Sequence, residues 1–105
     1  MLLLPEAGYL KGRRFEWKVR SYFRSLGFVV IRAAASKPID LVALRNGEAF
    51  LIECKYNASI TRHEKEQMLK LAEKAGATPL LAVKKKGKRG FRLVNLKNGT
   101  SKYIK

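Results

Sequence analysis

The sequence predicts an α/β fold in which a mixed β-sheet is flanked by helices. Two segments have the apolar period of an amphipathic helix, and short runs of β-branched and aromatic residues lie between and after them. The chain has 105 residues, and 47% of them are hydrophobic, which suits one domain with one core. We therefore treat residues 1–105 as a single domain and expect residues 1–10 to form an N-terminal arm.

The first predicted helix spans Arg13–Leu26. At about 100° per residue, Phe15, Val19 and Phe23 fall on one apolar stripe that should face the core. Gly27 follows as a residue that ends a helix. This helix should therefore pack on one face of the sheet.

Turn and capping signals divide the rest of the chain. Asn46-Gly47 and Asn98-Gly99 are typical of hairpin turns, and Thr61-x-x-Glu64 is a capping box that opens a second helix. The remaining elements are expected in this order: strands Phe28–Arg32, Asp40–Arg45 and Glu48–Lys55, a helix Arg62–Ala75, and strands Leu80–Lys84, Phe91–Leu96 and Thr100–Ile104.

The charge of the chain points to a polyanionic partner. Lys and Arg number 23 against 8 Asp and Glu, a net charge of +15, and the default partner of such a protein is nucleic acid. Basic residues gather on one side of the first helix and again in Lys84–Arg89, which contains five basic residues in six. The ordinary alternative is a solvated helix face and a solvated turn. We interpret them as DNA-binding, and the candidates are Arg13, Arg14, Arg20, Lys37, Lys84, Lys85 and Lys86.

Several classes of protein are disfavoured by composition. Cys54 is the single cysteine and His63 the single histidine, which excludes a disulfide framework and multi-Cys or two-His zinc sites. No stretch approaches the roughly 20 apolar residues of a membrane span, so no membrane partner is expected. A reducing, cytoplasmic, DNA-associated location is the simplest expectation.

Two acids and a lysine form the most informative pattern. Glu53 and Lys55 share one face of a predicted strand, and the Asn46-Gly47 turn brings Asp40 to the same end of the sheet. Two close carboxylates repel each other, and a divalent cation such as Mg²⁺ or Mn²⁺ removes the conflict. The bland alternative is a solvated Glu-x-Lys face and an Asp in a turn. The combination in a basic chain favours metal-assisted phosphodiester hydrolysis.

The chain resembles the archaeal-type Holliday junction resolvases of the PD-(D/E)XK nuclease superfamily. The matching stretches are Lys11-Gly12-x-x-x-Glu16, Gly27-Phe28-x-Val30-x-Arg32, Ser36-x-x-x-Asp40-Leu41-Val42-Ala43, Ile52-Glu53-x-Lys55 and Ala82-Val83-Lys84. The resemblance implies a restriction-endonuclease-like fold forming one nuclease domain. It also implies that Glu16, Asp40 and Glu53 hold Mg²⁺, with Lys55 and Ser36 in the catalytic centre and Arg32 close to DNA.

The resemblance further implies a homodimer that cuts two strands of a four-way DNA junction. Two alternatives stay open. One is a related nuclease that acts on flaps, ends or restriction-type sites, because the segment between Lys55 and the second helix is shorter than the family usually has. The other is a non-catalytic basic nucleic-acid-binding protein, which the intact set of acids disfavours.

Overall fold

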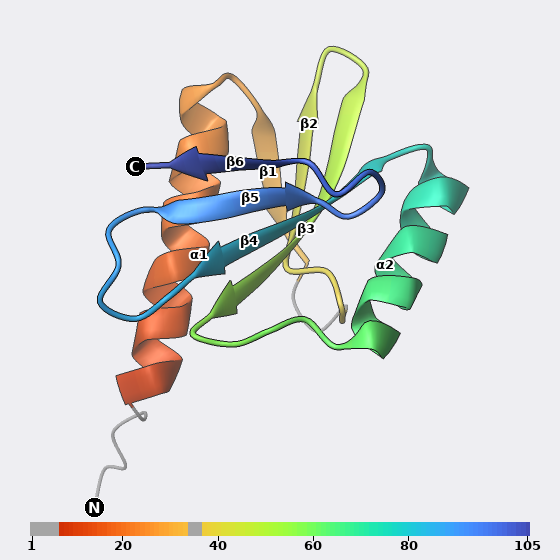
Figure 1. Ribbon diagram of the computed structural model, residues 1–105. Helices are drawn as coiled ribbons and strands as arrows, with labels where there is room; N and C mark the ends of the chain where they lie inside the picture. The colour runs from red at the N-terminus through yellow and green to blue at the C-terminus, as the bar shows by residue number, and fades with distance from the viewer. Residues whose placement is uncertain (1–6, 34–36) are drawn as a thin grey trace, which may run out of the picture.

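The computed structural model describes residues 7–33 and 37–105, in which two helices flank one six-stranded sheet (Figure 1). Over these residues, neither helix is long and apolar enough to cross a membrane. The elements are α1 (Ala7–Ser25), β1 (Val29–Arg32), β2 (Leu41–Arg45), β3 (Glu48–Tyr56), α2 (Arg62–Ala75), β4 (Thr78–Lys84), β5 (Phe91–Asn95) and β6 (Ser101–Ile104).

The strands lie in the sheet in the same order as in the chain, from β1 to β6. β1, β2 and β3 form an antiparallel meander, and β4, β5 and β6 form a second one. The two meanders join where β3 pairs with β4 in parallel, and α2 makes the crossover between them. The sheet is therefore mixed, as the sequence predicts.

The two helices cover opposite faces of the sheet. Phe15, Val19 and Phe23 of α1 pack in one core cluster with Ile52 and other residues of the sheet. Met68 and Ala72 of α2 pack in a second cluster that contains Leu51 and Leu81. Adjacent residues of β3 thus serve different clusters because successive side chains of a strand point to opposite faces.

The start of α2 agrees with its sequence signals. The Thr61 hydroxyl accepts the Glu64 N–H, and the Glu64 carboxylate accepts the Thr61 N–H, each at 3.0 Å. This reciprocal pair is the predicted capping box, and it fixes Glu64 at the first turn of the helix.

The start of α1 differs from the prediction. The helix begins at Ala7 rather than Arg13, so residues 7–10 belong to the helix and not to an N-terminal arm. Gly12 lies inside the helix, where its cost of about 1 kcal/mol is small beside the packing of the buried stripe. Leu26 lies just outside the helix and is 44% exposed.

Candidate active site

Asp40 and Glu53 meet where β2 begins. Leu41 is paired with Ile52 in the antiparallel register, so Asp40, the residue before Leu41, lies at the end of the pairing beside Ile52 and Glu53. The Asp40 N–H donates to the Ile52 carbonyl at 2.9 Å, and the two carboxyl groups share a hydrogen bond. The predicted approach of these two acids at one end of the sheet is confirmed.

Burial makes the Glu53 carboxyl group retain a proton. Glu53 is 6% exposed, and this burial, followed by the hydrogen bond and negative charge of Asp40, raises the pKa of Glu53 to about 9. The positive charge of Lys55 acts in the opposite direction but does not offset the burial. At neutral pH Glu53 therefore keeps its proton. A divalent cation can take the place of that proton, so this donor set suits Mg²⁺ or Mn²⁺.

The Asp40 side chain is held by the backbone of β3. Its Oδ2 atom accepts the Cys54 N–H at 2.7 Å, while its own carbonyl accepts the Ala33 N–H at 2.8 Å. The carboxylate thus takes the place of a strand carbonyl where the hairpin ladder ends. This contact orients Asp40 toward Glu53.

Cys54 lies on the α1 side of the sheet, as alternation predicts, but it is partly exposed rather than buried. Burial of the sulfur, followed by the charges of Asp40, Glu16 and Glu53, raises the pKa of its thiol. The thiol is therefore expected to stay neutral at physiological pH.

Glu16 is engaged by an arginine rather than by the other two acids. Arg32 of β1 donates from Nε to the Glu16 carboxylate of α1 at 2.7 Å. Within residues 7–33 and 37–105, no group of three or more acidic, histidine or cysteine side chains is assembled that could hold a metal ion. The structure thus brings Asp40 and Glu53 together and keeps Glu16 on Arg32.

Lys55 has an anchor that the sequence reasoning missed. Its Nζ atom lies 3.0 Å from Oε2 of Glu64, and both side chains are about one quarter exposed. The Thr61 backbone N–H, followed by Lys55, lowers the pKa of Glu64 to about 2. The capping box located Glu64 at the start of α2, but only the path of the 57–61 loop brings it to Lys55.

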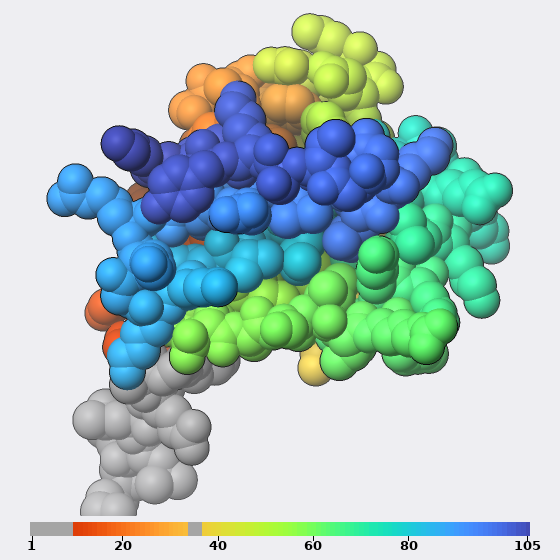
Figure 2. Space-filling model, in the orientation of Figure 1, coloured from red at the N-terminus to blue at the C-terminus, as the bar shows by residue number. Residues whose placement is uncertain are grey.

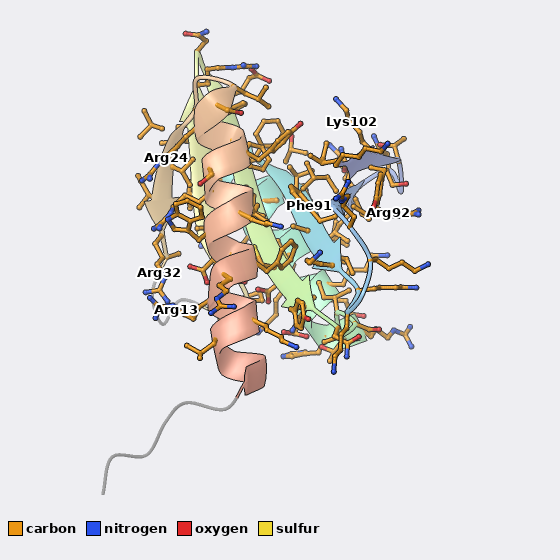
Figure 3. The ribbon with its side chains drawn as sticks, turned by 90° about the vertical axis from the view of Figure 1, so that its left-hand side faces the viewer. Arg13, Arg24, Arg32, Phe91, Arg92 and Lys102 are labelled. Atoms are coloured by element: carbon orange, nitrogen blue, oxygen red, sulfur yellow. The ribbon has the colours of Figure 1, made fainter. Side chains whose placement is uncertain are left out.

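The remaining predicted residues fall into three groups. Ser36 lies outside the described residues. Arg13, Arg14, Lys37, Lys85 and Lys86 are exposed, and Figure 3 shows Arg13 and Arg32 beside α1. Arg20 is half-buried, and its Nε atom is buried without a hydrogen-bond partner.

Lys84, which is predicted to contact DNA phosphate, also binds the loop that follows it. Its Nζ atom donates to the carbonyls of Lys88 at 2.6 Å and Gly90 at 3.4 Å. The ammonium group therefore ties together the connection between β4 and β5. The exposed lysines of that connection, Lys85 and Lys86, remain available to a ligand.

Comparisons with known proteins agree with the geometry. Residues 7–103 match the family described as archaeal Holliday junction resolvase. Over 87 residues the chain is 37% identical to crossover junction endodeoxyribonuclease Hjc of Methanocaldococcus jannaschii, covering 79% of this chain and 65% of that protein. The chain thus spans just under two thirds of the length of this curated relative.

A solved structure is similar over most of the fold. The Holliday junction resolvase Hjc of the archaeal hyperthermophile Archaeoglobus fulgidus matches with a TM-score of 0.71 and 25% sequence identity. The match covers 90% of this chain and 83% of that one. The sheet and its two helices therefore have the arrangement of a solved resolvase.

Proposed function

The chain belongs to the archaeal Holliday junction resolvase family, and on that premise we propose that it is a Mg²⁺-dependent endonuclease that resolves four-way DNA junctions. The observation that carries the proposal is the contact of the buried Glu53 with the half-buried Asp40, with Lys55 two residues further along the strand of Glu53. A pure DNA-binding protein gains nothing from a buried acid pair beside phosphates, since like charges repel. The substrate would place the protein in the cytoplasm, with the DNA.

Asp40 and Glu53 would hold the metal, and Glu16 would join them on release from Arg32. Mg²⁺ supplies Lewis-acid activation of a phosphodiester and lowers the pKa of a bound water. Lys55, which Glu64 holds in place, is positioned to bind a phosphate oxygen or to orient the attacking water. Arg32 would exchange its contact with Glu16 for a DNA phosphate, so one rearrangement serves both residues. Ser36 is proposed to lie near this centre.

The DNA surface is proposed to include Arg13, Arg14 and Arg20 of α1, together with Lys37, Lys85 and Lys86. Their shared property is positive charge without a nearby excess of acid, which suits contacts to phosphate oxygens. Trp17 stands among the basic residues of α1 and is 58% exposed, so its ring is accessible to a DNA base or sugar.

A homodimer would supply the two active sites that symmetric cutting needs. The supporting observation is an apolar patch on β1 and β2 formed by Val29 (63% exposed), Ile31 (52%) and Leu44 (38%). Val29 pairs with Leu44, and Ile31 pairs with the half-buried Val42, so these side chains lie on one face. An exposed patch of this kind is typical of a protein contact, and a second copy of the chain is the partner that the family implies.

The proposal is tested with Glu53→Gln on a labelled four-way junction. We expect at least a hundredfold loss of Mg²⁺-dependent cleavage, with junction binding in chelator preserved, since affinity comes from cations on phosphates. Glu48→Gln is the control because Glu48 is an exposed carboxylate on the same strand. Near-normal cleavage by Glu53→Gln would exclude Glu53 from the active site. An equal loss of cleavage in Glu48→Gln would show that the effect is not specific to Glu53.

A cruciform-bearing supercoiled plasmid tests the paired cuts. A dimer that makes both cuts within one complex gives linear DNA, because the first nick relaxes the plasmid and removes the cruciform. Independent nicking gives open circles. A monomer by light scattering that yields only open circles would support the flap or end nuclease instead, and a protein that binds but never cuts would support the non-catalytic alternative.

A further inference from the structure

We propose that the surface around Tyr103 is a second DNA site, which binds an unpaired strand by stacking a base on the tyrosine ring. The site is a hollow of about 690 Å³ between the β4–β5 connection and β6. Its lining includes Tyr103, Arg92, Lys85 and Lys88, with Val83 beneath them. The inference rests on the proposed function only in taking DNA as the ligand, and it adds the strand that this site would select.

The hollow combines a π-face with cations and contains no carboxylate among its lining residues. From Lys84 to Lys105 the chain has nine Lys and Arg and no acid, which favours a polyanion over a protein partner. A lysine cluster alone would suit any phosphate. A half-exposed aromatic ring among the cations adds a surface on which a base can stack. Bases inside a duplex are already stacked on their neighbours, so only an unpaired or splayed base can stack on the ring.

The Tyr103 ring lies beside the place where Gly90 approaches β6. It is 52% exposed, and its hydroxyl lies over Gly90, where an added Cβ would come within 3.0 Å of the oxygen. The absence of a side chain at Gly90 therefore leaves room for the Tyr103 hydroxyl and for the end of β6.

Hydrogen bonds within the β4–β5 connection determine where the lysines of the hollow lie. Lys84 donates to the carbonyls of Lys88 and Gly90, and the Lys88 N–H donates to the Lys85 carbonyl at 3.1 Å. These bonds form a tight turn whose exposed side chains, Lys85 and Lys88, lie at the hollow. Figure 2 shows the surface of the β4–β5 connection and that of β6 gathered at one end of the molecule.

The hollow lies on the same face of the sheet as the candidate active site. The strand register forms one row in which Lys55 pairs with Val83, Val83 with Arg92, and Arg92 with Tyr103. Directly paired residues share a face, so Tyr103 lies three strand spacings from Lys55, or about 14 Å. Figure 3 shows Arg92 on the side of the sheet away from α1, whereas its neighbour Phe91 lies toward α1. One DNA strand could therefore pass from Lys55 to Tyr103 without leaving this face.

Two labelled probes in chelator test the stacking contact. One is oligothymidylate of about ten nucleotides, within the site size of single-strand-binding surfaces, and the other is an abasic chain of the same length with the same phosphates. We expect Tyr103→Ala to weaken binding of oligothymidylate about fivefold or more and to leave binding of the abasic chain unchanged. Tyr103→Phe keeps the ring and should bind both probes as the native protein does.

Arg92→Ala and Lys102→Ala form the matched pair for charge. Both side chains are exposed, but Lys102 pairs with Leu93 and so lies on the α1 side of the sheet. Arg92→Ala should weaken the binding of both probes. Lys102→Ala should weaken the binding of neither probe by more than about twofold, which allows for long-range charge. Circular dichroism of each variant establishes that it is folded.

Three outcomes would overturn the inference. They are an equal loss on both probes for Tyr103→Ala, no loss on either probe, and equal losses for Arg92→Ala and Lys102→Ala. Because these measurements use no metal and no cleavage, they are separate from the Glu53→Gln assay. If Glu53→Gln cuts normally while Tyr103→Ala loses oligothymidylate, the proposed nuclease site falls and the stacking site stands.

Discussion

The ammonium group of Lys55 lies 3.0 Å from the carboxylate of Glu64, the residue that also caps α2. One Glu64 oxygen accepts Lys55, and the other accepts the Thr61 N–H. A lysine beside a buried acid pair would otherwise have many rotamers. The first turn of α2 thus restricts the position of the proposed catalytic lysine, although it lies on the other side of the 57–61 loop.

Glu64→Gln isolates this ion pair, since glutamine can still accept the Thr61 N–H in a capping box. The lowered pKa of Glu64, about 2, means that its charge stabilises the fold above its ordinary pKa of 4.5, and this stability is lost as pH falls through 2. We expect the variant to be less stable by up to about 1 kcal/mol at pH 7, with the difference shrinking below pH 4.5. Urea unfolding at several pH values measures this, and a difference that stays constant toward pH 2 would contradict it.

Glu53→Gln should change stability with the opposite dependence on pH. The pKa of Glu53 is raised to about 9, so the folded protein binds a proton that the unfolded chain releases above pH 4.5. Native stability therefore falls relative to the variant as pH rises from 4.5 to 9, by up to about 1.4 kcal/mol per pH unit for one proton. If the free energy of unfolding in chelator changes with pH in the same way for both proteins, Glu53 does not carry a proton in the folded state.

Mg²⁺ should restore the stability that the acid pair lowers. A cation that binds the folded state alone stabilises it by about 2.7 kcal/mol at one hundred times its dissociation constant. We expect Mg²⁺ or Mn²⁺ to raise the melting temperature of the native protein and to have little effect on Asp40→Asn. Scanning calorimetry with and without chelator measures both, and an equal rise in the two proteins would place the bound cation elsewhere.

Gly90→Ala and Gly87→Ala separate crowding from backbone conformation. Both glycines have a positive φ, 78° and 79°, so both substitutions carry the same conformational penalty. A Cβ at Gly90 would also collide with the Ile104 carbonyl oxygen, whereas nothing lies within 4 Å of one at Gly87. We expect Gly90→Ala to be the more destabilising by about 1–3 kcal/mol in denaturant unfolding. Equal losses of stability in the two variants would show that β6 can move away from an added Cβ at residue 90 at no cost.

Junction affinity should fall steeply with salt because most of it comes from displaced counterions. Each neutralised phosphate adds about −0.9 to the slope of log affinity against log salt, so six or more contacts give a slope of roughly −5 or steeper. Fluorescence anisotropy in chelator measures the slope. A slope near zero would contradict the assignment of the basic surfaces to DNA.

The sequence predicted most of the fold because its local signals agree with one another. The capping box and Gly76 placed α2 at Arg62–Ala75, the bounds that the structure has. The Asn46-Gly47 hairpin turn likewise predicted that Asp40 and Glu53 lie close together. The start of α1 was wrong by six residues, since Gly12 weakens a helix locally but does not end one that is packed on a sheet.

The rest of the site depends on contacts between distant segments. No spacing rule links Lys55 to Glu64, Glu16 to Arg32, or Lys84 to the carbonyls of its own loop. Tyr103 was likewise a plain strand residue in the sequence. It became a candidate only when four strands set it in one row with Lys55.

The parallel pairing of β3 with β4 has a consequence for the order of assembly. The pairings of β2 with β3, β4 with β5 and β5 with β6 each join neighbours through a short turn or loop and can close without a helix. Docking of β4 on β3 must wait for a connection that contains all of α2, and closing a longer segment carries a larger loss of chain entropy. Asp40 and Glu53 lie before this connection, and Arg92 and Tyr103 lie after it. We therefore expect the burial of Met68 and Ala72 against Leu51 and Leu81 to bring the two parts of the proposed DNA surface together.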